Sequence, residues 1–487
     1  MRKTKIICTL GPSTDDPSIL RQLMLSGMDV ARINMSHQAH DAHRKRIAQV
    51  HELREELGLP IAILIDTKGP EIRLGEFSAP KVELRAGELF TLTTTPLEGD
   101  EHIASISFAG LPEDVLPGGH ILIDDGLIEM TVEEITDTDI ICDVVNGGPV
   151  SNHKGVNVPG AELSMPYISE SDRNDILFGI ELGFDIIAAS FVRNKEDVLE
   201  VRRILDEHNS KMMIVAKIEN MQGIKNLDEI IDVSDGIMVA RGDMGVEVPL
   251  EEVPVLQKQI IKKAVAKGKQ VITATQMLES MIHNPRPTRA ETTDIANAIY
   301  YRTDALMLSG ETAYGKYPVE AVKTMTKVAA QAEKDKLSEN DIRIPLDESS
   351  NDVTAFLAKQ AVKATSKLKI RAIITDSFSG RTARNIAAFR GKYPVLAICY
   401  KEKTMRHLAL SYGVEAIYMP EKANGQAYYF AALRKLLDDG VLCESDMVAY
   451  LSSGKQGTQT SFLEINVVGD VLKYAMDYVL PNRNRYL

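Results

Sequence analysis

The sequence predicts an α/β protein whose first 335 residues form a (β/α)8 TIM barrel, interrupted by a small all-β domain and followed by a doubly wound α/β domain. Two observations lead to this fold class. Eight short apolar runs alternate with segments of helical periodicity, which is typical of buried parallel strands joined by helices. One gap in the alternation is far longer than the others, and its texture changes to short alternating runs bounded by Gly and Pro.

The eight runs are rich in β-branched residues and end in polar ones. Helical periodicity follows most of them, for example over residues 17–27, 195–208 and 250–268. Thr288 and Glu291 form a capping-box pattern, and Pro318 suits a first helical position. In order, the predicted strands are KIICTL from Lys5, DVARIN from Asp29, IAILID from Ile61, DIIAASF from Asp185, MIVAKI from Met213, GIMVA from Gly236, QVITAT from Gln270 and DALMLS from Asp304.

The long gap separates the third and fourth runs. After about Asp335 the β/α alternation restarts with RAIITDS and continues to SFLEINVV, which predicts the doubly wound domain. The stretch 470–487 is expected to be a helix and a loose tail. We therefore expect three domains, namely a barrel of residues 1–69 and 165–335, an inserted β domain of residues 70–164, and an α/β domain of residues 336–487.

Composition excludes some classes of partner. The net charge of -13 and the pI near 5.4 argue against a nucleic-acid or membrane-surface partner, because no basic face dominates. No apolar run is long enough for a signal-peptide core or a spanning helix, so a cytoplasmic location is expected. The cysteines show no metal-binding spacing and are expected to be free buried thiols: Cys8, Cys142, Cys399 and Cys443.

Polar residues gather at the carboxyl ends of the predicted strands, where barrels of this kind have their active sites. Lys217 is the candidate clamp for a phosphoryl group, and Glu219 and Asp243 suit a Mg²⁺ ion. Together, the polar residues at the strand ends form a ring that contains both cations and anions, as phosphoryl transfer requires. Its members are Arg32, Asn34, Ser36, Asp66, Thr67, Lys68, Lys217, Glu219, Asp243, Thr275, Ser309 and Glu311.

Plainer interpretations of these residues exist. Acids at loop starts are most often ordinary surface residues, and Lys217 could be paired with a neighbouring acid without a further task. The density of charge at the strand ends favours a functional site, because a structural barrel does not need such a ring.

Eight long motifs occur in order along the chain: KTKIICTLGPST, VARINMSHQAHDAH, IDTKGPEIRLG, KGVNVPG, VAKIENMQGI, MVARGDMGVE, ATQMLESMIHNPRPTRAE and MLSGETAYGKYP. They make the chain similar to the pyruvate kinase family over its whole length except the tail. The resemblance implies phosphoryl transfer from phosphoenolpyruvate to ADP, giving pyruvate and ATP. It also implies that the inserted domain is a small β barrel that acts as a lid, and that the α/β domain is regulatory.

The resemblance implies roles for the catalytic residues. Glu219 and Asp243 correspond to ligands of Mg²⁺ (or Mn²⁺), and Lys217 to the lysine that stabilises the moving phosphoryl group, with Arg32 beside it. Backbone amides of residues 241–243, including Gly242, and the Thr275 hydroxyl would hold the substrate carboxylate. The proton for enolpyruvate would come from the region of Thr275, Ser309 and Glu311. The donor itself stays open, and a water relay is plausible because threonine is too weak an acid to act alone.

The resemblance also implies two further groups of binding residues. Asn34, Ser36, Asp66 and Thr67 match a K⁺ site, and Glu71 in the GPEIR motif predicts activation by K⁺. The nucleotide phosphates would meet Arg73 and Lys154, which lie on or beside the lid, together with three residues of the barrel: Arg32, Asn34 and His37.

In the third domain, TDSFSGRTAR joins a strand to a helix start and offers amides and hydroxyls for a phosphate. The resemblance implies a phosphorylated small-molecule effector here, with Lys455 able to close over it, and a homotetramer. Whether the effector is a sugar phosphate or a nucleoside monophosphate stays open, and so does a plain turn at this position. The effector residues would be Thr375, Ser377, Ser379, Gly380, Arg381 and Thr382.

Two other functions are weighed against this one. A Mg²⁺-dependent lyase or aldolase acting on phosphoenolpyruvate or pyruvate would share the Glu and Asp metal pair, but does not call for the lid or the K⁺ residues. A metabolite sensor with an inactive barrel is the non-enzyme alternative, and the intact Lys217, Glu219, Asp243 and Thr275 argue against it.

Overall fold

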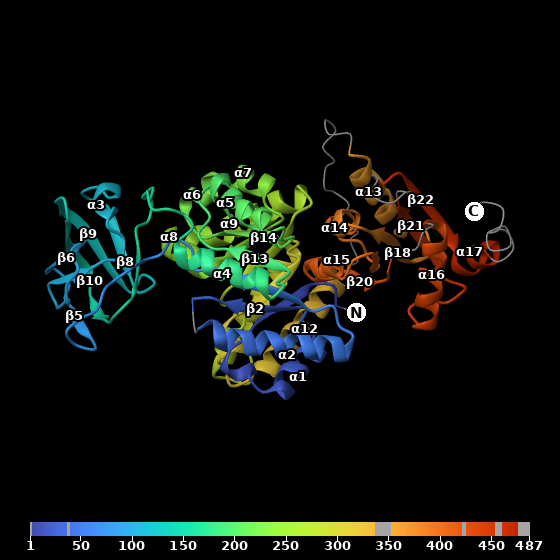
Figure 1. Ribbon diagram of the computed structural model, residues 1–487, viewed down its shortest axis with the longest axis horizontal. Coiled ribbons are helices and arrows are strands. Elements are labelled where there is room, and N and C mark those ends of the chain that lie inside the picture. Colours follow the sequence, from blue (N-terminus) through green and yellow to red (C-terminus); the bar gives the residue numbers. More distant parts are fainter. Residues whose placement is uncertain (1, 37–38, 337–351, 421–424, 453–459, 476–487) are drawn as a thin grey trace.

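A computed structural model describes residues 2–36, 39–336, 352–420, 425–452 and 460–475. These residues form three parts that follow one another along the long axis of the molecule, with the inserted segment at one end, the barrel in the middle and the C-terminal part at the other end (Figure 1). Within the described residues, no helix combines the length and the apolar character needed to cross a membrane. The predicted fold class is confirmed.

The central part is a closed barrel of eight parallel strands in the described chain, in the order β1-β17-β16-β15-β14-β13-β3-β2. Each of the eight predicted runs supplies one strand. Their bounds are β1 Lys5–Thr9, β2 Val30–Asn34, β3 Ala62–Asp66, β13 Ile186–Ala189, β14 Met213–Ile218, β15 Gly236–Ala240, β16 Gln270–Ala274 and β17 Ala305–Leu308.

The strands are apolar throughout because both of their faces are covered. In β3, Ala62 and Leu64 point into the barrel, whereas Ile63 and Ile65 contact the helices outside, as the two-residue period of a strand requires. Ala409 and Leu410 of the C-terminal part join the interior cluster, so the third part packs against one end of the barrel.

A ring of helices covers the barrel (Figure 1). Helix α10 begins with the predicted capping box, since the Thr288 side chain accepts from Glu291 N and the Glu291 side chain accepts from Thr288 N. Helix α12 begins at Pro318 as predicted. The helices and short turns are η1 Pro12–Thr14, α1 Pro17–Ser26, α2 His40–Leu57, α4 Glu170–Glu181, α5 Lys195–Glu207, α6 Met221–Lys225, α7 Leu227–Val233, α8 Arg241–Glu247, η2 Leu250–Glu252, α9 Val253–Ala266, η3 Glu279–Ile282, α10 Arg289–Tyr300, α11 Gly310–Ala313 and α12 Pro318–Lys336.

The segment inserted after β3, residues 70–164, is called the lid from here on. It has its own apolar core and a seven-stranded sheet in the order β4-β12-β8-β9-β10-β6-β7, with β11 and β5 as a separate pair. An antiparallel bridge between Leu74 and Ile106 joins its two edges, so the sheet curls on itself. Its elements are β4 Ile72–Arg73, β5 Val82–Leu84, β6 Leu89–Thr93, β7 Ile103–Ser105, the one-turn helix α3 Leu111–Asp114, β8 His120–Ile123, β9 Ile128–Ile135, β10 Asp139–Asn146, β11 Gly148–Val150 and β12 Gly155–Asn157.

The lid leaves the barrel at Gly69, where only glycine fits. Its φ is +75°, and a Cβ there would lie 2.8 Å from the Ser190 carbonyl oxygen. The close approach keeps the start of the lid against the loop after β13.

The C-terminal part has a five-stranded sheet in the order β20-β19-β18-β21-β22, in which β22 alone runs antiparallel to its neighbour among the described strands. Apolar clusters cover both faces of the sheet, as a doubly wound domain requires. Its elements are α13 Val353–Thr365, β18 Ile370–Ser377, α14 Arg381–Ala388, β19 Val395–Cys399, α15 Glu402–His407, η4 Leu408–Leu410, β20 Val414–Tyr418, α16 Gly425–Asp438, β21 Met447–Ser452, β22 Phe462–Val467 and α17 Val468–Tyr474.

All four cysteines are free, but the expectation that all are buried is wrong for Cys443, which is exposed. It lies in the turn between α16 and β21, where its backbone amide donates to Asp446.

Candidate active site

A buried ammonium group lies at the carboxyl end of the barrel. Lys217 of β14 donates to Asp66 Oδ1 at 3.1 Å and to Ser190 Oγ at 2.8 Å, and its Nζ lies 2.9 Å from Glu219 Oε1. Asp66 also accepts from Arg32 Nε at 2.7 Å. Four neighbouring strand ends, those of β2, β3, β13 and β14, therefore meet in one network.

The network fixes the charge of Lys217. Burial alone would lower its pKa, but the carboxylates of Asp66 and Glu219 outweigh burial and hold the pKa above its ordinary value. Burial would likewise raise the pKa of Asp66, but Lys217 and Arg32 outweigh it and hold that pKa below its ordinary value. Lys217 therefore stays a cation, which suits an anionic ligand rather than proton transfer.

Glu219 is fully buried beside this cation. Its Oε2 accepts from Phe191 N at 2.6 Å, and its Oε1 forms the 2.9 Å ion pair with the Lys217 ammonium. Burial raises the pKa of Glu219 to about 8 against the attraction of Lys217. A buried carboxylate whose ionised form is disfavoured by burial fits a divalent cation, because the cation would hold the group in that ionised form.

Asp243 and Thr275 come from the next two strand ends. Asp243 lies in the first turn of α8, and Gly242 N of the same turn donates to Thr275 Oγ1 at 2.7 Å. The Arg241 side chain turns away and forms an ion pair with Asp294 at 2.6 Å, while its NH2 donates to Thr275 O at 2.6 Å. Thr275 has a φ of +67°, a conformation uncommon for a β-branched residue, so this turn is held under strain.

Glu311 and Ser309 follow β17. The Glu311 carboxylate accepts from Ser309 N at 2.7 Å and from Leu278 N at 2.9 Å, and it is 1% exposed. Burial raises its pKa, and the two amides oppose that rise. With both oxygens bound to the backbone, Glu311 is placed to hold Ser309 rather than to contact a ligand directly.

The residues proposed for a monovalent cation lie on adjacent strands. Asn34 of β2 is opposite Asp66 of β3 in the sheet register, and Asn34 Oδ1 accepts from Ser36 N at 3.1 Å. Thr67 O accepts from Ser190 Oγ at 2.6 Å. Glu71 forms an ion pair with Arg73 at 2.6 Å. His37 lies outside the described residues.

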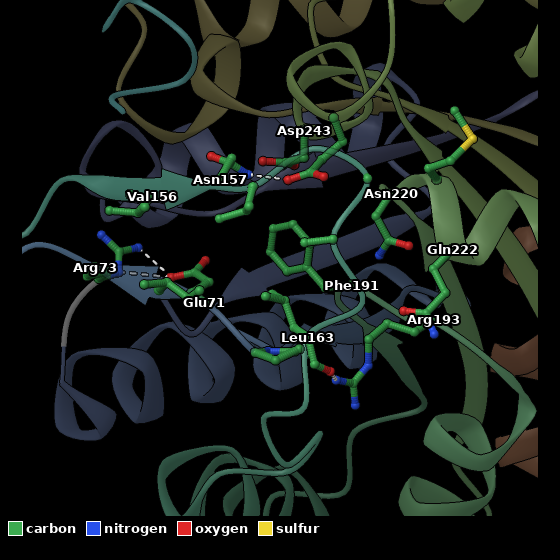
Figure 2. Close-up of a pocket in the computed structure, with 18 of the residues that line it drawn as sticks. Glu71, Arg73, Val156, Asn157, Leu163, Phe191, Arg193, Asn220, Gln222 and Asp243 are labelled. Atoms are coloured by element: carbon green, nitrogen blue, oxygen red, sulfur yellow. Dashed lines mark hydrogen bonds and ion pairs between the residues drawn. The ribbon is translucent and has the colours of Figure 1, made fainter. Parts of the chain in front are cut away.

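A cavity of about 390 Å³ opens between the lid and the barrel. It contains four of the predicted residues, Glu71, Arg73, Lys154 and Asp243, and Figure 2 shows Arg73 bonded to Glu71 on the lid side with Asp243 across from them. Lys154 forms an ion pair with Asp124 at 2.8 Å. Both lid cations therefore have partners that an anionic ligand would have to displace or share.

Among the described residues, no group of three or more acids, histidines or cysteines could hold a metal ion. Glu219 and Asp243 are two carboxylates, so a Mg²⁺ ion there would complete its shell with water and substrate oxygens, as Mg²⁺ usually does.

Comparison with known proteins decides the family. The model of the pyruvate kinase barrel domain matches residues 1–322, and that of the pyruvate kinase alpha/beta domain matches residues 356–466. The chain belongs to the pyruvate kinase family.

Individual pyruvate kinases agree with this assignment. The pyruvate kinase of Clostridium acetobutylicum is 45% identical over 473 residues, which cover 96% of this chain and 100% of that one. The pyruvate kinase of Bacillus licheniformis is 45% identical over 477 residues, which cover 97% of this chain and 81% of that one. The crystal structure of a pyruvate kinase from Cryptosporidium parvum has a TM-score of 0.90 and 37% identity, covering 96% of each chain.

Some cavity residues of this chain were not among the predicted site residues. Phe191 and Arg193 follow β13, and Asn220 and Gln222 follow β14 (Figure 2). They lie at strand ends like the predicted residues, so position in the chain could have found them. None of the predicted residues came from the fourth run, and the fifth run gave only its charged residues Lys217 and Glu219.

The loop proposed for an effector joins β18 to α14 in the C-terminal part. Gly380 has a φ of +82°, and its N donates to Ser377 Oγ at 2.9 Å. Arg381 forms an ion pair with Asp352 at 3.0 Å, and the hydroxyls of Thr382 and Thr460 lie 2.9 Å apart. The turn thus gathers Thr375, Ser377, Ser379, Gly380, Arg381 and Thr382, while Lys455 lies outside the described residues.

Proposed function

We propose that this protein transfers the phosphoryl group of phosphoenolpyruvate to ADP, giving pyruvate and ATP. The buried ammonium of Lys217, fixed by Asp66, Ser190 and Glu219, is the observation that carries the proposal. In phosphoryl transfer the charge on the moving group is stabilised by preorganised cations rather than by covalent chemistry. A lysine that cannot lose its proton at working pH is suited to that task.

Arg32 supplies a second fixed cation. Its Nε is bonded to Asp66 and its NH1 donates to Thr9 Oγ1 at 2.8 Å, so its guanidinium is held before any substrate arrives. The amides of residues 241–243 and the Thr275 hydroxyl would hold the substrate carboxylate. Contacts of this kind would hold the substrate in the orientation that the reaction needs.

Arg73 and Lys154 on the lid would hold the nucleotide phosphates, together with Asn34 and His37. Because both lid cations line the cavity opposite Asp243, approach of the lid brings them toward the transferred group and excludes water.

The enolpyruvate left after transfer needs a proton. The Thr275 and Ser309 hydroxyls are proposed to pass it through water, since neither is acidic enough alone. Glu311 would act through Ser309, whose amide it binds.

Metal ions complete the proposal. Glu219 and Asp243 would bind Mg²⁺ or Mn²⁺, which neutralises phosphate charge when bound. Asn34, Ser36, Asp66 and Thr67 would hold K⁺, and Glu71 goes with K⁺ dependence. A phosphorylated effector at residues 375–382, a homotetramer and a cytoplasmic location stay predictions. Thermal-shift screening with sugar phosphates and nucleoside monophosphates addresses the effector.

The test is an assay in which pyruvate release from phosphoenolpyruvate is coupled to NADH oxidation, with Mg²⁺ and with or without ADP and K⁺. The proposal expects turnover only when ADP is present, and faster turnover with K⁺. Release of pyruvate and inorganic phosphate without ADP would indicate hydrolysis instead, whereas a lyase or aldolase would release no pyruvate from phosphoenolpyruvate alone. No turnover, together with a substrate-induced rise in Tm, would favour a metabolite sensor.

A further inference from the structure

Two contacts hold the lid to the barrel across the cavity. Arg193 NH1 donates to Leu163 O at 3.0 Å, at the point where the chain returns from the lid. On the other side, Asn157 Nδ2 of the lid donates to Glu247 Oε1 of α8 at 2.8 Å. In the described chain, these two are the side-chain hydrogen bonds that join the lid to the barrel, if bonds to the connecting residues 69–71 and 164–165 are left aside.

The Asn157 bond reaches the part of the lid that carries its cations. Asn157 ends β12, which pairs with β4 so that Gly155 is opposite Arg73. Lys154 immediately precedes the same strand. Because a paired strand moves as a unit with its neighbours, one bond at Asn157 fixes where both lid cations lie.

On the barrel side, Glu247 shares a helix with the proposed metal ligand. Asp243 and Glu247 are four residues apart in α8 and therefore lie on the same helix face, and both line the cavity. Figure 2 shows the bond from Asn157 reaching a carboxylate beside Asp243.

The charges around Glu247 favour a neutral hydrogen-bond donor, such as the Asn157 amide, as its partner. Burial raises the pKa of Glu247, the bond from Asn157 partly offsets that rise, and the negative charge of Asp243 adds to it. A carboxylate at position 157 in place of the amide would face Glu247 at hydrogen-bond distance, and two carboxylates so close cannot both be ionised without strong repulsion.

We propose that Asn157 and Glu247 are a positioning pair that sets the lid cations Arg73 and Lys154 over Asp243 for use of the nucleotide. The inference rests on the proposed phosphoryl transfer to ADP. The pair does not contact the Lys217 network. It should therefore affect the binding of ADP more than the binding of phosphoenolpyruvate.

The experiment is a donor–acceptor exchange, with KM for ADP, KM for phosphoenolpyruvate and kcat measured between pH 6 and pH 8.5. N157D should raise the KM for ADP roughly tenfold over the unsubstituted enzyme at pH 8.5, because a hydrogen bond to a charged group is replaced by repulsion. At pH 6 the two carboxyls can share a proton, and the increase should shrink to about threefold or less.

The double variant N157D/E247Q reverses the bond, since the amide introduced on α8 can donate to the carboxylate introduced on the lid. It should bring the KM for ADP back to within about threefold of the unsubstituted enzyme at every pH. E247A removes the acceptor without adding charge, and it should raise the KM for ADP by the same factor at every pH. This variant tests the pair if N157D does not fold.

N146D is the matched control. Asn146 is an exposed lid residue whose Nδ2 donates to Leu127 O at 2.8 Å within the lid, so N146D adds the same charge without reaching the barrel. The inference is overturned if N157D and N146D have equal effects, if the double variant is no better than N157D, or if E247A leaves the KM for ADP unaltered. Absence of ADP-dependent turnover in the unsubstituted enzyme would instead refute the proposed function.

Discussion

Binding of a divalent cation is expected to strengthen steeply between pH 6 and pH 8. Burial raises the pKa of Glu219 to about 8, so at neutral pH a cation that uses this carboxylate must first displace a proton. Below pH 8 the ionised fraction falls about tenfold per pH unit, which costs about 1.4 kcal/mol for each unit. The cation concentration at half-saturation should therefore be about tenfold lower at pH 7 than at pH 6.

The same shift predicts how stability depends on pH without a divalent cation. The folded pKa of Glu219 lies above the 4.5 of an unperturbed glutamate, so the protein favours the neutral form. The resulting stability is fully present below pH 4.5 and is lost as pH rises through about 8, by roughly 5 kcal/mol at most. A bound cation should recover much of this loss.

Manganese binding measured by electron paramagnetic resonance gives the affinity, and calorimetry in buffers of different ionisation enthalpy gives the protons released. At pH 7 about 0.9 proton should leave for each cation bound. The Glu219→Gln variant should bind Mn²⁺ weakly, and its affinity for Mn²⁺ should depend little on pH. Glu207→Gln, which alters an acid paired with Arg173 on the outer helices, should behave as the unsubstituted protein. Half-saturation that changes less than twofold from pH 6 to pH 8 would refute the reasoning.

Three further outcomes are expected. Lys217→Met should lower kcat by at least about 10²–10³-fold, while circular dichroism stays native because Glu219 can take up a proton; near-normal turnover would contradict the clamp role. Glu71→Lys should keep activity without K⁺, since the lysine would replace the ion's charge, and an unaltered K⁺ requirement in the coupled assay would count against the K⁺ proposal. Leu64→Ala, inside the barrel, should lower the free energy of unfolding in urea by about 2–5 kcal/mol, and a loss below 1 kcal/mol would mean that the site repacks.

The barrel could be predicted because its signals are local. A strand buried on both faces must be apolar throughout, so IAILID and GIMVA identify themselves, and a capping box such as that of Thr288 and Glu291 involves residues three apart. The direction of β22 could not be predicted, because an edge strand of alternating burial has the same pattern in either direction.

Within the site, residue positions could be predicted better than side-chain partners. Lys217 and Glu219 lie two apart on one strand end, and a strand-end rule is enough to select them. That Glu311 also binds the Leu278 amide, or that Arg241 turns to Asp294, depends on loops far apart in the chain. Such long-range partners leave no periodic pattern in the sequence.

Direct observation of phosphoryl transfer is the most direct test of the central claim. In ³¹P magnetic resonance of the enzyme with phosphoenolpyruvate, ADP, Mg²⁺ and K⁺, the phosphoenolpyruvate signal should fall as the γ-phosphate signal of ATP rises in equal amount, and Lys217→Met should show neither change. Loss of the phosphoenolpyruvate signal into inorganic phosphate, or equal transfer by Lys217→Met, would contradict a barrel that uses its buried lysine to pass the phosphoryl group to ADP.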